Sequence, residues 1–196
     1  MRKNMLLEIG TEEVPAEWLK DIATQLKDKI CALLKSYEIS YDDYELFYTP
    51  RRIAVIIKNV ATEQNDKYVE ITGPPKEVAI TNDNDWSEAA IGFAKAQSIP
   101  VKELKFKLKG KKEVVSCEKL VKGSKTQSIL KSNLSLLISK IEFPKSMVWE
   151  ITEDRRQISE RFRFVRPIRW VVALFGETII PFEMAGIKAG SEISTS

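Results

Sequence analysis

Residues 5–34, which read MLLEIGTEEVPAEWLKDIATQLKDKICALL, contain the clearest structural pattern of the sequence. Its first apolar run ends at Gly10 and predicts a short strand. Apolar residues then recur at steps of three and four, which predicts an amphipathic helix of about five turns. Thr11 is one candidate for the N-cap of this helix. Pro15 favours a start nearer residue 15, because proline suits the first helical turn.

Alternating and turn-bounded runs predict further elements along the rest of the chain. The runs at 44–48 and 53–58 flank Thr49-Pro50-Arg51-Arg52 and predict a hairpin. Other strands are predicted at 69–72 (stopped by Gly73-Pro74-Pro75), 102–112 (with a turn at Gly110), 114–120, 168–175 and 178–182. A short helix is predicted after Ser87, and a second long amphipathic helix over 124–141.

This order of elements indicates an α+β fold with largely antiparallel sheets and two long amphipathic helices. If the chain divides into two lobes, we expect them at residues 1–100 and 101–196. No Gly- or Ser-rich joint marks that boundary.

The composition limits the chemistry that the chain can perform. The 196 residues are 43% hydrophobic and 30% charged, which is enough apolar material for a packed core. The absence of histidine excludes Ser-His-Asp and Cys-His nucleophile pairs and histidine-ligated metal sites. Cys31 and Cys117 make no disulfide framework and no zinc site. Chemistry that uses carboxylates alone stays open, but we assign no catalytic residue and no metal site, and the composition favours a binding or assembly module.

The sequence also bears on localisation. No apolar run is long enough to cross a membrane, and the first residues lack the uncharged core of a signal peptide. The sequence therefore predicts a cytoplasmic protein without membrane contact.

Separated patches of charge on a nearly neutral chain indicate a surface that meets its partners in one orientation. Six lysines lie within residues 102–112, and four arginines are interleaved with aromatic residues within 161–170. The lysine run suits either a phosphate-facing strand or a charged sheet edge that resists aggregation. Arginines mixed with aromatics are typical of single-stranded RNA contacts, but a strand with one buried aromatic face and one solvated arginine face explains them too.

The arginines of Thr49-Pro50-Arg51-Arg52 are open to two interpretations as well. Their planar guanidinium groups suit phosphate, whereas a solvated hairpin tip or a structural ion pair is the alternative. Arg166 precedes a proline among apolar neighbours, where a buried ion pair is plausible. Glu8, Glu12 and Glu13 cluster in sequence, but the N-terminal end of a helix accounts for Glu12 and Glu13 without catalysis.

Six blocks of the sequence, in order and covering essentially the whole chain, resemble one family. They are EIGTEEVP at 8–15, TPRRIAV at 49–55, GPP at 73–75, AAIGFA at 89–94, FPKSMVW at 143–149 and FVRPIRW at 164–170. Together they resemble the β subunit of bacterial heterotetrameric glycyl-tRNA synthetase. Val14 stands where leucine is commoner in that family. Val148 stands where a basic residue is usual, so any phosphate contact of that position is lost here.

The resemblance implies an α2β2 enzyme that joins glycine to its tRNA using ATP with Mg²⁺, at an adenylation site in the α subunit. It implies the α subunit, a second β subunit and tRNA(Gly) as partners, and no cofactor held by this chain. The chain is then the N-terminal region of a longer protein, similar to the editing-related module of phenylalanyl-tRNA synthetase β chains.

The expected contribution of this region is to tRNA binding and subunit assembly. A purely structural assembly module and an editing-like domain are the alternatives. The predicted phosphate contacts are Arg51, Arg52, Arg163, Arg166 and Arg169.

Overall fold

The computed structural model describes residues 1–81, 85–110, 112–145, 147–154 and 157–190. The chain forms two compact units, one made of Met1–Asn65 with Ser124–Ser196 and the other of Asp66–Gly123. The second unit is thus inserted into the first, a division that differs from the expected lobes at 1–100 and 101–196. The reason is strand pairing, because the first strand of the chain lies between strands from both ends of the first unit.

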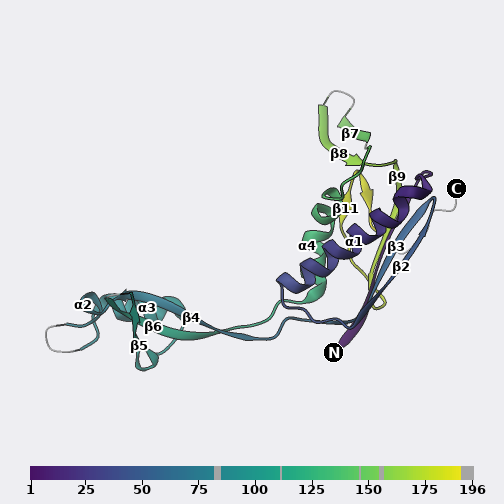
Figure 1. Ribbon diagram of the computed structural model, residues 1–196. Coiled ribbons are helices and arrows are strands. Elements are labelled where there is room, and N and C mark those ends of the chain that lie inside the picture. The colour runs from purple at the N-terminus through teal and green to yellow at the C-terminus, as the bar shows by residue number, and fades with distance from the viewer. Residues whose placement is uncertain (82–84, 111, 146, 155–156, 191–196) are drawn as a thin grey trace. The chain divides into compact units, whose positions relative to one another are not determined.

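The first unit is built on a five-stranded antiparallel sheet (Figure 1). Its strands are β1 (Arg2–Thr11), β2 (Asp43–Thr49), β3 (Arg52–Ala61), β9 (Ile168–Phe175) and β10 (Thr178–Ile179), in the order β10-β9-β1-β3-β2. β2 and β3 form the predicted hairpin around Pro50 and Arg51. The architecture confirms the predicted α+β class with antiparallel sheets.

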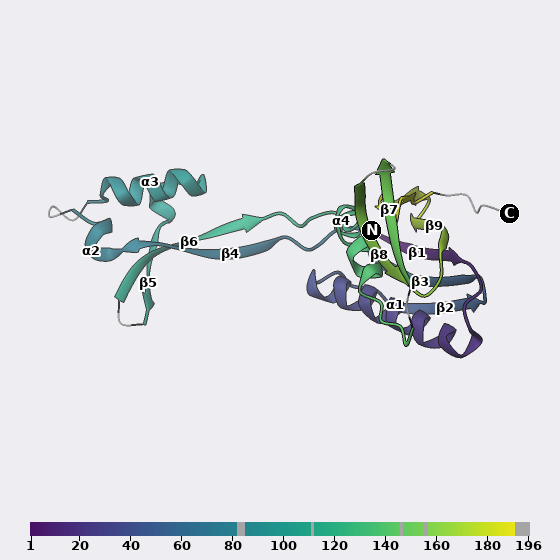
Figure 2. The ribbon, with the colours of Figure 1, turned by 90° about the horizontal axis from the view of Figure 1, so that it is seen from above.

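Two long helices, α1 (Ala16–Ser36) and α4 (Thr126–Ser139), share one core with the sheet. Figure 2 shows α1 running alongside β1, β3 and β2. Alternate strand residues point into this core, because side chains alternate across a strand; they include Met5, Leu7 and Ile9 of β1, Ile53, Val55 and Ile57 of β3, and Val171, Ala173 and Phe175 of β9. α1 begins directly after Pro15, so the later of the two predicted starts is confirmed, while Thr11 is the last residue of β1.

The first unit also contains a hairpin that the sequence analysis did not predict as such. It consists of β7 (Met147–Asp154) and β8 (Gln157–Phe164). Phe162 and Phe164 of β8 are buried, and Phe143 meets Phe164 edge-on with ring centroids 4.8 Å apart. The predicted strand at 178–182 is shorter than expected, since β10 ends at Ile179. Two further short strands, β11 (Glu183–Met184) and β12 (Ile187–Lys188), pair with each other.

The second unit has a three-stranded sheet of β4 (Lys67–Pro75), β6 (Lys112–Val121) and β5 (Lys105–Lys109), in the order β4-β6-β5. Helices α2 (Lys76–Ala79) and α3 (Glu88–Gln97) and the 3₁₀ turn η1 (Val101–Glu103) accompany it. Ser87 caps α3 as predicted, with its side chain accepting from the Ala90 amide. Of the strand predicted at 102–112, only Lys105–Lys109 forms the edge strand β5, as one interpretation of the lysine run expected, whereas Val101–Glu103 forms η1 and Lys112 begins β6.

Gly73 does not end β4, which continues through Pro75. A Cβ at Gly73 would lie 2.9 Å from the ring of Phe93, so two of the six sequence blocks are in contact here. No helix in the described part of the chain is long and apolar enough to cross a bilayer.

Candidate functional site

Three of the six sequence blocks converge at one end of the five-stranded sheet. Gly10 of β1 is paired with Arg52 of β3 on one side and with Trp170 of β9 on the other. The turn after β1 is tied to both neighbours through the backbone. The Thr11 amide donates to the Arg51 carbonyl (2.9 Å), and the Glu12 amide donates to the Pro167 carbonyl (3.1 Å). We call the residues of this region, 8–14, 50–52 and 166–170, the sheet-end cluster.

Glu8 is the buried centre of the sheet-end cluster, with only 7% of its surface exposed. The indole Nε1 of Trp170 donates a hydrogen bond of 2.9 Å to Glu8 Oε1. Arg52 Nε lies 3.4 Å from the same oxygen, and its guanidinium lies 5.9 Å from the centre of the Trp170 ring. A Cβ at Gly10 would lie 2.0 Å from that ring, so the indole occupies the space that only glycine leaves free. Glu8 therefore accepts a hydrogen bond from Trp170 and forms an ion pair with Arg52.

Two of the other three arginines of the cluster form ion pairs, and the third, Arg166, donates to a backbone carbonyl. Arg51 Nε lies 3.6 Å from Glu13 Oε1, and Arg169 forms an ion pair with Glu12. Arg166 Nε donates to the backbone carbonyl of Glu13 at 3.0 Å. Arg166 is exposed, so the interpretation of this residue as part of a buried ion pair is wrong.

The charges of the sheet-end cluster largely compensate one another. Its four arginines are four of the five predicted phosphate contacts, and its three carboxylates are Glu8, Glu12 and Glu13. An arginine that already faces a carboxylate must exchange that partner before it binds a phosphate. This exchange reduces the net free energy of phosphate binding. The geometry therefore favours a structural role for these side chains over a phosphate site.

Thr11 adds a buried polar group to the same region. Only 2% of the surface of Thr11 is exposed, and its Oγ1 has no hydrogen-bond partner among the described residues. An unpaired buried hydroxyl destabilises a fold, because the desolvation of the oxygen is not offset.

The fifth predicted contact, Arg163, lies elsewhere. It is exposed near the end of β8, where it lines an open groove of about 630 Å³ with Lys29, Ser139, Lys140, Ile141, Glu142 and Phe143. Within the part of the chain that the structure describes, no carboxylate forms an ion pair with Arg163, Lys29 or Lys140. We call this feature the basic groove. The sequence analysis missed the two lysines, which have no local motif and meet Arg163 only through the packing of α1, α4 and β8.

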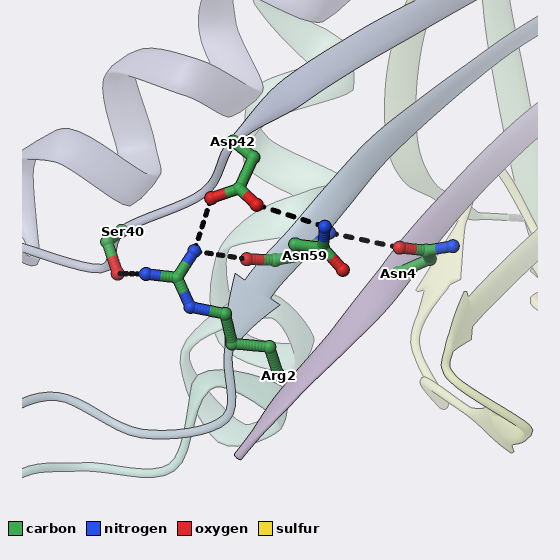
Figure 3. Close-up of polar contacts among 5 residues, drawn as sticks. All are labelled: Arg2, Asn4, Ser40, Asp42 and Asn59. Atoms are coloured by element: carbon green, nitrogen blue, oxygen red, sulfur yellow. Dashed lines mark hydrogen bonds and ion pairs between the residues drawn. The ribbon is translucent and has the colours of Figure 1, made fainter.

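A second polar network lies at the opposite end of β1, and Figure 3 shows its five residues. Arg2 pairs with Asp42, while its two terminal nitrogens also donate to the Asn59 carbonyl and to Ser40 Oγ at 3.3 Å. Asn59 has a positive φ of 52°. Its side-chain Nδ2 donates to Asp42 Oδ2 (2.9 Å), and its backbone amide donates to the side-chain Oδ1 of Asn4 (3.0 Å). These bonds fasten the loop after α1 to the sheet, which is a structural role that no sequence motif indicated.

The comparisons with known proteins agree with the six sequence blocks. The sequence model of the family described as "Glycyl-tRNA synthetase beta subunit" matches residues 5–196. The chain belongs to this family. Among its relatives are proteins named "Glycine--tRNA ligase beta subunit" in Bacillus subtilis (41% identical over 189 residues, 96% of this chain), Halalkalibacterium halodurans (39% over 191, 97%) and Listeria monocytogenes (38% over 192, 97%). The chain spans 26% of the length of each of these relatives.

Membership of the glycyl-tRNA synthetase beta subunit family gives the sequence blocks a structural meaning. Three of them form the sheet-end cluster, and two meet at Gly73 and Phe93 in the second unit. The described residues contain no group of three or more Cys, Asp or Glu residues that could hold a metal ion.

Proposed function

We propose that this chain is the N-terminal region of the β subunit of a glycine–tRNA ligase and that it contributes to tRNA(Gly) binding and subunit assembly. The observation that carries the proposal is the family match over residues 5–196, together with relatives that share one name. The partners in this proposal are the α subunit and a second β subunit in a cytoplasmic α2β2 enzyme. ATP with Mg²⁺ is used at the α subunit.

The chain itself performs no adenylation in this proposal. It has no histidine, and the three carboxylates of its sheet-end cluster are engaged by arginine or tryptophan donors. We expect the purified chain to show no glycine-dependent ATP–pyrophosphate exchange above buffer, whereas the assembled enzyme does exchange. Exchange by the chain that survives removal of contaminating synthetase would contradict the proposal, as would deacylation of mischarged tRNA.

The face of the five-stranded sheet opposite the shared core supports the assembly role. Its residues alternate with those of the core along each strand. Phe47 of β2, Leu6 of β1, Ile56 of β3 and Leu174 of β9 are exposed or partly exposed on it, whereas Ala54 and Val172 are buried. Phe47 is 52% exposed on the edge strand β2. An apolar face of this kind is typical of a surface that meets another protein surface.

The assembly role is tested with Phe47→Ser in the whole β subunit. We expect weaker association with the α subunit in sedimentation velocity and an unchanged melting temperature, because the exposed ring contributes little to the core of its own unit. Tyr68→Ser is the matched control, since Tyr68 is 74% exposed on the other unit. Unchanged association in Phe47→Ser would remove this face from the assembly surface.

A further inference from the structure

We infer that the basic groove binds phosphate groups of an RNA strand, with Lys29, Lys140 and Arg163 as the contacts. The inference rests on the proposed function, because it assigns the tRNA-binding role to one site. It departs from the sequence prediction, in which four other arginines shared that role.

The three cations come from three separate elements. Lys29 lies within α1, Lys140 caps the C-terminal end of α4, and Arg163 lies one residue before the end of β8. All three line one open groove of about 630 Å³. Charged side chains brought together without a local motif require the tertiary fold, so the groove exists only in the folded unit.

The wall of the groove is held firmly. Gln25 of α1 donates to the Glu142 carbonyl and accepts from the Glu142 amide, both at 2.9 Å. The next residue, Phe143, packs edge-on against Phe164, which is fully buried. A site fixed before binding loses less conformational entropy when the ligand arrives.

The charge of the groove points to an anion. Three cations face one carboxylate, Glu142, and the described residues offer none of the three an ion-pair partner. Neighbouring like charges repel one another, and a bound anion relieves that repulsion. Arginine adds a planar pair of donors that suits phosphate oxygens.

The proposed function favours RNA over an acidic protein segment, and the surroundings of the groove are compatible with it. A second depression of about 300 Å³ adjoins the groove, shares Lys29 and Lys140 with it, and is otherwise lined by Ala32, Leu33, Ser36, Asn133, Leu136 and Leu137. In the proposed function the strand is tRNA, which can place phosphates in the groove while the apolar face of a base contacts the adjoining, largely apolar strip.

The test measures tRNA(Gly) binding to the assembled α2β2 enzyme as a function of salt. Lys29→Gln, Lys140→Gln and Arg163→Gln are made singly and together. Each lost phosphate contact should lower the magnitude of the slope of log K against log salt by about 0.7–0.9. At 0.1 M salt that change weakens binding about five- to eightfold per contact. The effect should be similar for different RNA sequences, since phosphate contacts do not read bases.

Lys20→Gln on α1 and Lys131→Gln on α4 are the matched controls. Both lysines are exposed on the same helices and do not line the groove. They should leave the slope unchanged, and melting curves of all variants should match that of the parent.

The possible results distinguish a failure of the basic groove as an RNA site from a failure of the proposed function. If the triple variant keeps the parental affinity and slope while tRNA binding still requires the β subunit, the groove is refuted and the proposed function stands. If tRNA binding by the parent does not depend on the β subunit, the proposed function fails. If the variants lose association with the α subunit and keep the RNA slope, the groove binds an acidic protein segment, and the RNA inference is overturned.

Discussion

Replacement of Gly10 by alanine tests the geometry of the sheet-end cluster directly. The new Cβ would lie 2.0 Å from the Trp170 ring, a separation that real Cβ contacts essentially never show. Gly10 is not among the residues with positive φ, so the penalty is steric and does not come from the backbone. The indole must therefore move, and its hydrogen bond to Glu8 is lost when it does.

The size of the effect follows from the lost hydrogen bond between Trp170 and Glu8 and from the overpacking around the new Cβ. A hydrogen bond to a charged group contributes about 1.5–3 kcal/mol, and an overpacked site costs about 1–3 kcal/mol. Trp170 is only partly buried and can swing outward, which relieves most of the overpacking. Alanine also lowers the conformational entropy of the unfolded chain, which stabilises the folded protein by about 0.4–1 kcal/mol. We expect Gly10→Ala to lower the free energy of unfolding by about 2–3 kcal/mol.

Urea denaturation followed by circular dichroism measures this loss. With a slope of about 2 kcal/mol per molar, the midpoint should fall by about 1–1.5 M. Gly92→Ala is the matched control, because a Cβ at Gly92 in α3 meets nothing within 4 Å and alanine favours a helix. In a Trp170→Ala background, Gly10→Ala should be nearly neutral, since the two residues are in contact. An unchanged midpoint for Gly10→Ala in the parent would show that the Trp170 ring does not block a side chain at this position.

Three further predictions concern single groups. A double-mutant cycle on Arg169 and Glu12, measured by urea denaturation, should give a coupling below about 1 kcal/mol, because both side chains are half exposed. Thr11→Val should raise the free energy of unfolding by about 1 kcal/mol in the same assay, since the hydroxyl has no partner among the described residues. A hydrogen bond to Cys31 raises the pKa of Tyr41 to about 12, so the native state holds this proton more tightly than the unfolded state. Its contribution to stability is present below pH 10 and is lost between about 10 and 12, and Tyr41→Phe should remove that pH dependence in unfolding titrations.

The sequence predicted the elements that rest on local pattern. The apolar stripe of α1 defined that helix because each buried residue recurs within one turn of the last, and Pro15 marked its start. The turn between β2 and β3 was predicted for the same reason, since proline favours a turn and the flanking runs favour strands.

Strand order could not be predicted, because it depends on pairing between distant residues. β1 pairs with β9 across about 160 positions, and nothing local to either strand encodes that choice. The inserted unit was missed for a related reason. The chain enters and leaves it through the paired strands β4 and β6, so no flexible linker marks the boundary.

In the candidate site, too, the local features were predicted and the contacts between distant residues were not. Sequence correctly singled out the arginine blocks and the carboxylates of 8–15 as notable, but it gave no sign that they face each other. That fact follows from the register in which Gly10 pairs with both Arg52 and Trp170. Only the folded structure shows which cations have a carboxylate partner.

Whether a cation already has a carboxylate partner decides how much binding free energy it can contribute to an RNA backbone. A phosphate that approaches Arg51 or Arg169 competes with Glu13 or Glu12, and the displaced carboxylate is left close to the incoming negative charge. The same phosphate at Arg163 displaces only water and counterions, because no described carboxylate pairs with that guanidinium. Counterion release is the main source of non-specific affinity for nucleic acid, so sites with unpaired cations dominate the salt dependence. The basic groove should therefore contribute more to the salt slope of tRNA binding than the carboxylate-paired Arg51, Arg52 and Arg169, which should contribute mainly to the stability of the sheet.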